Sequence, residues 1–314
     1  MDTEYNDLFL TAPWGNIAEL KTFCFIIPVA TWGSPSDQPV IMLHGRQDSL
    51  ATFVPLVKLL PKNYYYVGVD LPGNGRSDAF PKGIALARYH YIHTIDVVKK
   101  NMGWKKFIFM GHSMGCEIGL FYNAANPGHI SAFILLDPGP TFQRLVHPDH
   151  VYFYKHYYER YYGNYKRYNG PSKVYTKKQI LEAVMKGRKL NVEQAEIILS
   201  RNLVQIGEDR YRLSTDSRSK YFVPQNMAND YYIELFTRNS PPTFITSMSD
   251  GNGGYMRGKE GADEILEAMS RKIKVFKRLN LDGGHDHHIT HPDELVNPIV
   301  KFLSAHGRTV VAKL

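Results

Sequence analysis

Short apolar runs alternate along this chain with segments of helical periodicity, and most of the runs stop at a turn that carries polar residues. Apolar runs bounded by turns are typical of strands that are buried on both faces of a parallel sheet. Ligands of such sheets bind outside the carboxyl ends of the strands. The pattern therefore predicts a mostly parallel sheet flanked by helices, with its chemistry in the turns. The predicted strands are residues 39–43, 64–69, 107–110, 132–136, 243–247 and 273–279.

The strand rhythm stops between Pro140 and Pro241 and gives way to helical periodicity. An insert of roughly 100 residues is far longer than an ordinary connection, which favours a lid over a loop. Residues before position 39 are expected to add antiparallel edge strands, at 17–20 and 23–29. The predicted division is a first core part at 1–140, a helical cap or lid at 141–240 and a second core part at 241–314.

The strongest local signal is Gly-His-Ser-Met-Gly at residues 111–115, between the apolar run 107–110 and a helical run at 116–122. A serine in this GxSxG context sits on a strained strand-to-helix turn that exposes its hydroxyl. The simpler interpretation, a tight glycine turn around a buried serine, does not account for the surrounding strand and helix. Ser113 is therefore the predicted nucleophile.

A serine nucleophile needs a base, and folds with this elbow supply the partners in the chain order Ser, acid, His. His285 follows the last predicted strand and precedes a helical run at 294–303, so we expect it to be the base. The acid is expected after the penultimate strand, where Asp250 lies. Asp137, which ends the preceding strand, is the alternative. Asp250 is preferred because it follows the insert, while an Asp before Pro-Gly commonly stabilises a turn.

The oxyanion of the tetrahedral intermediate needs two backbone N–H donors. Met114, directly after the nucleophile, is expected to supply one. Arg46, in the turn after the strand 39–43, is expected to supply the other, and Gly45 gives this turn its backbone freedom. His44, Gly45 and His112 are expected to line the substrate site. Asp48 either braces the turn or is an ordinary polar loop residue.

No metal or cofactor is expected. Three further histidines follow His285, and imidazole is a common metal ligand. Their spacing lacks the regular helical or hairpin pattern of zinc sites. The three are His287, His288 and His291.

Several motifs resemble the α/β-hydrolase superfamily: HG at 44–45, DLPGNGRSD at 70–78, GHSMG at 111–115, a late Asp and GGH at 283–285. Together with PWG at 13–15, HGRQD at 44–48 and YYYV at 64–67, they are similar to the animal serine hydrolase-like proteins. The resemblance implies an α/β-hydrolase fold with a mostly parallel eight-stranded sheet and a helical cap inserted after strand six. It also implies a Ser/Asp/His triad and, for some members, a vesicular or peroxisomal location. Two segments depart from the family pattern: the glycine-rich run 251–254 and the longer segment 21–30.

These residues lead us to expect a serine hydrolase that cleaves a small-molecule carboxylic ester or thioester through an acyl-enzyme. Serine at 113 argues against haloalkane dehalogenases and epoxide hydrolases, which use an aspartate at this position of the fold. One alternative is a receptor-like binding protein with slow or no turnover, because fold does not fix function. Another is lyase or cofactor-free oxygen chemistry with His285 as the base.

Charge and the chain ends bear on partners and location. Much of the net charge of +8, and most of the tyrosines, lie in the insert. This pattern favours a solvated face or an electropositive entrance for anionic substrates over nucleic-acid binding.

No apolar run reaches the roughly 18 residues of a membrane span, and two cysteines are too few for a disulfide framework. The last three residues, Ala312, Lys313 and Leu314, resemble the tripeptide read by the peroxisomal import receptor, so the peroxisome or the cytoplasm is expected.

Overall fold

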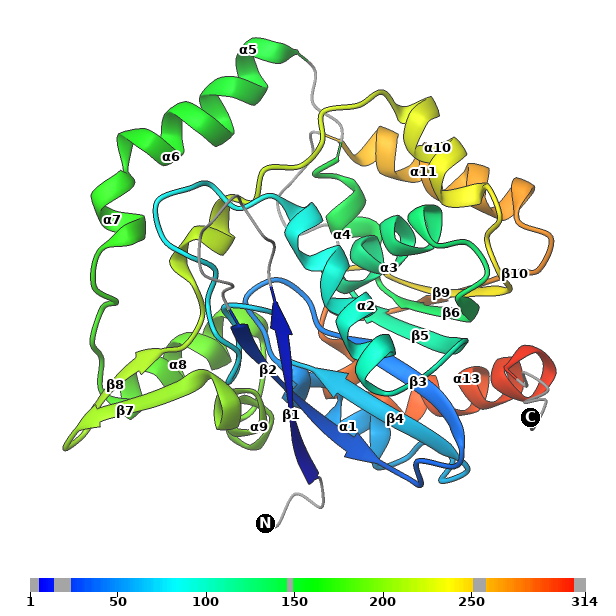
Figure 1. The fold of residues 1–314 in the computed structure, drawn as a ribbon, viewed down its shortest axis with the longest axis horizontal. Helices are drawn as coiled ribbons and strands as arrows, with labels where there is room; N and C mark the ends of the chain where they lie inside the picture. Colours follow the sequence, from blue (N-terminus) through cyan, green and yellow to red (C-terminus); the bar gives the residue numbers. More distant parts are fainter. Residues whose placement is uncertain (1–5, 14–23, 146–148, 251–257, 308–314) are drawn as a thin grey trace.

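The computed structural model describes residues 6–13, 24–145, 149–250 and 258–307, and its centre is an eight-stranded sheet with helices on both faces (Figure 1). The strand order is β1-β2-β4-β3-β5-β6-β9-β10. Strand β2 is antiparallel to both of its neighbours, and the remaining pairs are parallel. The strands are β1 (Asn6–Pro13), β2 (Cys24–Trp32), β3 (Gln38–Leu43), β4 (Tyr64–Val69), β5 (Phe107–His112), β6 (Ile130–Leu136), β9 (Thr243–Met248) and β10 (Phe276–Leu281).

Two helical layers cover the sheet. Helices α2, α3, α10 and α11 contribute to the apolar core on one face, and α1 and α13 to the core on the other. The helices that belong to these layers or lie beside them are η1 (Leu50–Phe53), α1 (Val54–Val57), η2 (Arg88–Tyr91), α2 (Ile92–Asn101), α3 (Met114–Ala125), α11 (Lys259–Lys272), α12 (His287–Thr290) and α13 (Pro292–His306).

Strand β5 shows why its sequence is apolar throughout. All six of its residues are buried. Phe107 and Phe109 point into the core beneath α2 and α3, whereas Ile108 and Met110 point into the core beneath α1 and α13. Alternate side chains of a strand face opposite sides, so a strand covered on both faces needs apolar residues at every position.

The six predicted core strands are confirmed as β3, β4, β5, β6, β9 and β10. The last begins at Phe276 instead of residue 273, because Ile273 still caps helix α11 through its N–H bond to the Met269 carbonyl. Of the predicted edge strands, 24–29 lies within β2. The other, 17–20, lies outside the described residues, as does Phe23.

The chain between β6 and β9 forms the insert and contains a two-stranded sheet that the sequence did not reveal. Strands β7 and β8 pair antiparallel in it. The domain boundaries at 140 and 240 stay a prediction. The elements of the insert are α4 (Gly139–Phe142), α5 (His150–Phe153), η3 (Tyr154–Glu159), α6 (Arg160–Gly163), α7 (Tyr165–Asn169), α8 (Lys177–Arg188), α9 (Val192–Asn202), β7 (Leu203–Gly207), β8 (Arg210–Leu213), η4 (Ser217–Tyr221) and α10 (Asn229–Thr237).

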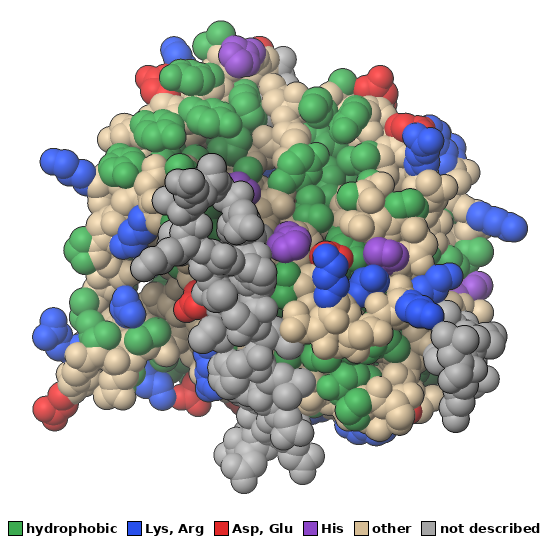
Figure 2. Space-filling model, viewed as in Figure 1, with side chains coloured by type: hydrophobic (Ala, Val, Ile, Leu, Met, Phe, Trp, Pro, Cys, Tyr) green, Lys and Arg blue, Asp and Glu red, His purple; other side chains and the backbone are tan. Residues whose placement is uncertain are grey.

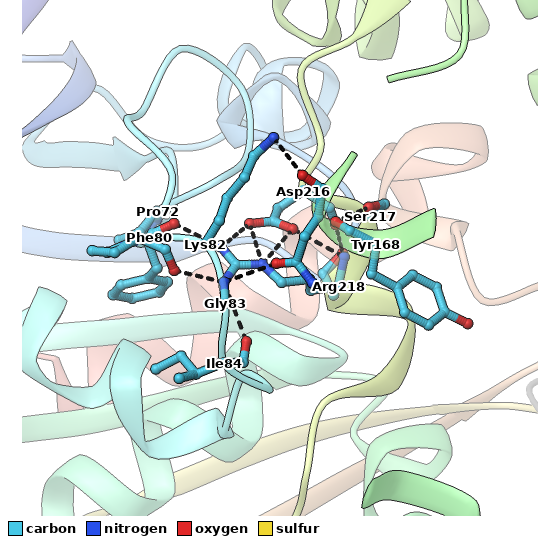
Figure 3. A network of polar contacts seen from close by, with 12 residues as sticks. Pro72, Phe80, Lys82, Gly83, Ile84, Tyr168, Asp216, Ser217 and Arg218 are labelled. Carbon is cyan, nitrogen blue, oxygen red and sulfur yellow. Dashed lines mark hydrogen bonds and ion pairs between the residues drawn. The ribbon is translucent and has the colours of Figure 1, made fainter. Parts of the chain in front are cut away.

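Two buried arginines fix the insert to the loop that follows β4. Arg218 donates to the carbonyls of Phe80 at 2.6 Å and Pro81 at 2.7 Å, and it forms an ion pair with Asp216 (Figure 3). Arg201 on α9 donates through Nε to Asp70 Oδ2 at 2.9 Å. Because both arginines are almost completely buried, this part of the insert is continuous with the core.

The segment from α5 to α7 arches away from the sheet and exposes aromatic side chains. Figure 2 shows apolar side chains gathered over these helices. Tyr154 and Tyr162 are each just over half exposed. No helix in the described ranges is both long and apolar enough to cross a membrane.

Candidate active site

The backbone at Ser113 has the strained geometry that the GxSxG motif predicts. Ser113 lies between the end of β5 and the start of α3, and its backbone has a φ of 51° and a ψ of −119°. A Cβ atom at Gly115 would come within 2.1 Å of the Leu43 carbonyl oxygen, so only glycine lets α3 approach β3 this closely. Strain of this kind is typical of functional sites and persists because the surrounding packing enforces it.

Ser113 opens into a cavity of about 690 Å³. His285 lines the same cavity, as do Gly45 and Arg46 of the turn after β3 and Arg188 of the insert. The carboxyl ends of β3, β5 and β6 and the loop after β10 therefore meet at one place, as expected for an open parallel sheet.

The acid that contacts His285 is Asp137, not Asp250. His285 Nδ1 lies 2.6 Å from Asp137 Oδ2. The other carboxylate oxygen of Asp137 accepts a bond from the Met248 N–H at 3.3 Å. Asp137 is only 4% exposed, so its side chain is held on both sides. A carboxylate on Nδ1 keeps the proton there and leaves Nε2 free to act as a base.

Asp250 lies at the rim of the cavity, and the prediction that it pairs with His285 is wrong. Its side chain is 59% exposed and makes an ion pair of 3.6 Å with Lys189. Its backbone N–H donates to the Gly283 carbonyl at 3.0 Å. The backbone thus fixes the loop before His285, while the carboxylate points to solvent and the insert.

The turn at 44–48 lies against Ser113. A Cβ atom at Gly45 would stand 3.1 Å from Ser113 Cβ and 3.0 Å from His112 Nδ1, so the backbone passes close beside the serine. Arg46 and Met114 both line the cavity. Their roles as oxyanion donors stay a prediction. The Arg46 side chain donates through Nη1 to the Lys220 carbonyl of the insert at 3.1 Å.

His44 does not line the cavity, contrary to the prediction. It is completely buried: Nε2 accepts from the Leu71 N–H at 3.0 Å, and Nδ1 lies 2.7 Å from the Gly45 carbonyl. These partners require a neutral ring with its proton on Nδ1. Burial lowers the pKa of His44, consistent with this state. His44 therefore fastens the turn to the loop after β4.

His112 lines the cavity and contacts the His285 backbone, and its role in substrate binding stays a prediction. Its Nε2 lies 3.0 Å from the His285 carbonyl, to which it donates. Its ring packs 4.6 Å from the His285 ring and 4.0 Å from the His288 ring, measured between centroids. Burial, followed by the charges of His288 and His285, holds the pKa of His112 well below its usual value. The ring is therefore neutral at pH 7.

Sequence reasoning missed an ion-pair cluster behind His285. Arg188, at the end of α8, donates through Nη2 to Asp48 Oδ2 at 2.8 Å and through Nε to Asp286 Oδ2 at 2.8 Å. Asp48 also accepts from the Ser49 N–H at 2.9 Å, so it does brace the turn. Burial opposes ionisation of Asp286, but the bonds and charge of Arg188 outweigh it and lower the pKa.

The other late histidines have partners in the protein. His288 Nε2 lies 2.7 Å from Thr52 Oγ1, and His287 Nε2 lies 3.0 Å from Glu294 Oε2. Burial lowers the pKa of His288 to about 3. Within the described residues, no three His, Cys, Asp or Glu side chains come together as ligands for a metal ion.

Residues 38–250 match the family model of the alpha/beta hydrolase fold. The chain belongs to this family. Human serine hydrolase-like protein 2 is 25% identical to it over 305 residues, which cover 95% of this chain and 94% of the human protein. The α/β-hydrolase fold and the similarity to serine hydrolase-like proteins are therefore confirmed, and they support a hydrolase.

Solved structures share this architecture. A hypothetical protein from Pseudomonas aeruginosa PAO1 superposes with a TM-score of 0.76 at 21% identity, covering 95% of this chain and 99% of that one. The thioesterase domain from the curacin biosynthetic pathway gives a TM-score of 0.72 at 18% identity, covering 94% and 99%. At these identities the likeness concerns the fold alone.

Proposed function

We propose that the protein is a serine hydrolase that cleaves a carboxylic ester or thioester through an acyl-enzyme. The observation that carries the proposal is the combination of a strained Ser113 and a His285–Asp137 pair at one cavity. A serine hydroxyl becomes a useful nucleophile only beside an oriented base. The cap role of the insert and the roles of Met114 and Arg46 belong to the same proposal.

The reaction follows from the roles of these groups. His285 Nε2 takes the Ser113 proton as Oγ attacks the carbonyl carbon, and Asp137 stabilises the resulting imidazolium through Nδ1. The Met114 and Arg46 N–H groups hold the oxyanion. His285 then gives the proton to the departing alcohol or thiol. Water, deprotonated by His285, attacks the acyl-enzyme, and collapse of the second intermediate releases the acid and returns Ser113.

The test is labelling with a fluorophosphonate probe and turnover of p-nitrophenyl esters and acyl-CoAs, comparing the wild type with Ser113→Ala. We expect labelling and turnover by the wild type, and a loss of kcat on the order of 10⁴- to 10⁶-fold in the variant. Thermal melting checks that both proteins are folded.

Other outcomes separate the alternatives. Labelling without turnover of any substrate would support the receptor-like binding protein. A folded wild-type protein that is not labelled would show that Ser113 is not an activated nucleophile and would overturn the proposal. The predicted location depends on Ala312, Lys313 and Leu314, which lie outside the described residues, so it stays a prediction.

A further inference from the structure

A second cavity, of about 170 Å³, lies in the insert and is called the insert cavity below. Its walls come from α7, from the chain at 171–175, from the end of β8 and from η4. Its described lining contains three cationic side chains, Arg167, Lys173 and Lys220, and no Asp or Glu. The cavity that contains Ser113, by contrast, is lined by charges of both signs. A cavity whose charges are all positive is suited to an anion.

The positive charge of the insert cavity is not cancelled by a neighbouring carboxylate. None of the three cations forms an ion pair with another described residue. Asp216, which caps η4, is already paired with Arg218 at 2.6 Å (Figure 3). Because Arg167, Lys173 and Lys220 are all exposed, an anion bound between them relieves their mutual repulsion without the cost of burying a charge.

Hydrogen bonds and ring packing hold the walls of the insert cavity in place. The Ser217 hydroxyl donates to the Tyr168 carbonyl at 3.0 Å, which fastens η4 to α7 (Figure 3). Tyr175 exchanges two backbone hydrogen bonds with Tyr211 of β8, at 2.9 and 2.8 Å. The rings of Tyr168 and Tyr221 pack with their centroids 5.2 Å apart. A site whose walls are already ordered loses less conformational entropy when it binds a ligand.

The insert cavity adjoins the cavity of Ser113 at the turn after β3. Gln47 in this turn lines both cavities. Its neighbour Arg46 lines the cavity of Ser113 and donates to the carbonyl of Lys220, a residue of the insert cavity, at 3.1 Å. One elongated ligand can therefore occupy both cavities.

The same turn sets the distance between the two cavities. A Cβ atom at Gly45 would stand 3.1 Å from Ser113 Cβ, and Gln47 follows two residues later. Two residues span at most about 7 Å, so the insert cavity begins on the order of 10 Å from Ser113. At about 1.2 Å of extension per bond, an anion in the insert cavity lies roughly eight or more bonds from the scissile carbonyl. Such a separation requires a long arm between the carbonyl and the anion.

We infer that the insert cavity binds a phosphate group of the leaving group, so that the enzyme cleaves thioesters of thiols that carry phosphate on a long arm, as phosphopantetheine and coenzyme A do. This inference rests on the proposed function and names its substrate class. Arginine and lysine both bind phosphate through charge-assisted hydrogen bonds. The three cations are exposed, so a large phosphorylated carrier stays hydrated there, while the 690 Å³ cavity holds the acyl group.

Four acetyl thioesters that differ only in the leaving group test this specificity. The series is S-acetylpantetheine, which lacks phosphate, followed by S-acetyl-4′-phosphopantetheine, acetyl-dephospho-CoA and acetyl-CoA. We expect kcat/KM for the best phosphorylated substrate to exceed that for S-acetylpantetheine by at least about tenfold, as one charge-assisted hydrogen bond allows. The step of the series at which kcat/KM rises identifies the phosphate that is bound.

Variants of the cavity lysines locate the effect. Lys173→Gln and Lys220→Gln should each reduce the ratio between the phosphorylated and the unphosphorylated substrate to about threefold or less, because each removes one cation from the phosphate. Lys100→Gln, at an exposed lysine of α2 that lines neither cavity, is the matched control and should keep the wild-type ratio. An unchanged ratio in both cavity variants would overturn the assignment of the phosphate to the insert cavity.

Calorimetry on Ser113→Ala tests binding without turnover. The probes are 4′-phosphopantetheine and adenosine 3′,5′-bisphosphate, and pantetheine and adenosine are their controls without phosphate. We expect at least one phosphorylated probe to bind more tightly than its control, and this difference should shrink in Lys220→Gln and at higher salt concentration. Equal affinities of both probes and their controls would overturn the phosphate site.

The two proposals fail in different ways. Equal kcat/KM for all four thioesters, with Ser113 still labelled by the fluorophosphonate, would overturn the phosphate specificity and leave the hydrolase intact. If the folded wild-type protein is neither labelled nor active, the hydrolase proposal fails. Calorimetry then still decides whether the insert cavity binds phosphate through Lys173 and Lys220.

Discussion

Asp137 connects two parts of the site through the two oxygens of one carboxylate. One oxygen contacts the ring of His285, and the other accepts the N–H at the end of β9. The residue has a φ of 48°, a left-handed conformation that Asp adopts more readily than most residues. The backbone at this position therefore turns the carboxylate from β6 towards the loop after β10.

The pair Asp137→Asn and Asp250→Asn tests the assignment with the same chemical change at both positions. In Asp137→Asn the amide can donate to Nδ1 and favour the wrong tautomer, so we expect kcat to fall by roughly 10³- to 10⁴-fold. In Asp250→Asn only an exposed ion pair is lost, and kcat should change by less than about tenfold. Ester hydrolysis at pH 7.5 gives both values. A larger loss in Asp250→Asn than in Asp137→Asn would contradict the assignment.

The sequence predicted Ser113 and His285, but it favoured Asp250 as the acid, whereas Asp137 contacts His285 in the structure. Both Asp137 and Asp250 lie between serine and histidine in the chain, and both follow strands that are neighbours in the sheet. The choice depends on the path of the loop at 282–286, which local patterns do not encode. The positive φ at Asp137 is visible only in the structure.

Helix α8 reaches the site through Arg188, its last residue. It lies between Asp48 in the turn after β3 and Asp286, the residue after His285. These two carboxylates belong to segments that must keep a fixed distance if the oxyanion donors and His285 are to act on one carbonyl. Arg188 is therefore a positioning residue of the proposed site.

Replacing Arg188 by Gln should leave two carboxylates facing each other without their cation. Removing one partner of a buried ion pair costs about 3 kcal/mol, and Arg188 is only about a quarter exposed. We expect a lower free energy of unfolding and a drop in kcat that exceeds the change in KM. Urea denaturation and steady-state kinetics measure the two effects. Lys178→Gln, at an exposed position of the same helix, is the matched control. Wild-type kinetics in a destabilised Arg188→Gln would limit this arginine to a structural role.

At the level of elements, central strands such as β4, β5 and β6 were predictable because they are buried on both faces and therefore almost entirely apolar. Strands β7 and β8 were not, because they are short and half or more exposed, so no apolar pattern marks them. The cluster of Arg188, Asp48 and Asp286 brings together residues that are up to 238 positions apart by their numbers, and no spacing rule connects them.

The whole molecule contains several histidines that are neutral because they are buried, and this makes its stability depend on pH. His44, His112 and His288 all have lowered pKa values in the folded state. The unfolded chain binds protons at these rings below about pH 6.5, whereas the folded protein does not. The contribution of these histidines to the free energy of unfolding is therefore fully present above about pH 6.5 and is lost as the pH decreases.

His288→Gln isolates one of these contributions. Glutamine can still bond Thr52 but does not titrate, so the free energy of unfolding should fall less steeply with decreasing pH than in the wild type. The difference is up to about 1.4 kcal/mol per pH unit between pH 6 and pH 4, above the folded pKa of about 3. Urea denaturation at several pH values measures it. Equal slopes for the two proteins would show that His288 takes up its proton in the folded state.

Three arginines of the insert also constrain how this architecture can be exchanged between relatives. Arg201 and Arg218 are buried and Arg188 is about a quarter exposed, and their partners Asp48, Asp70, Asp286 and the carbonyls at 80–84 belong to three separate core loops. A chimera that grafts a foreign segment between β6 and β9 would leave buried aspartates without cations. Grafts that carry along the matching core loops, or replace these aspartates, are the ones expected to fold.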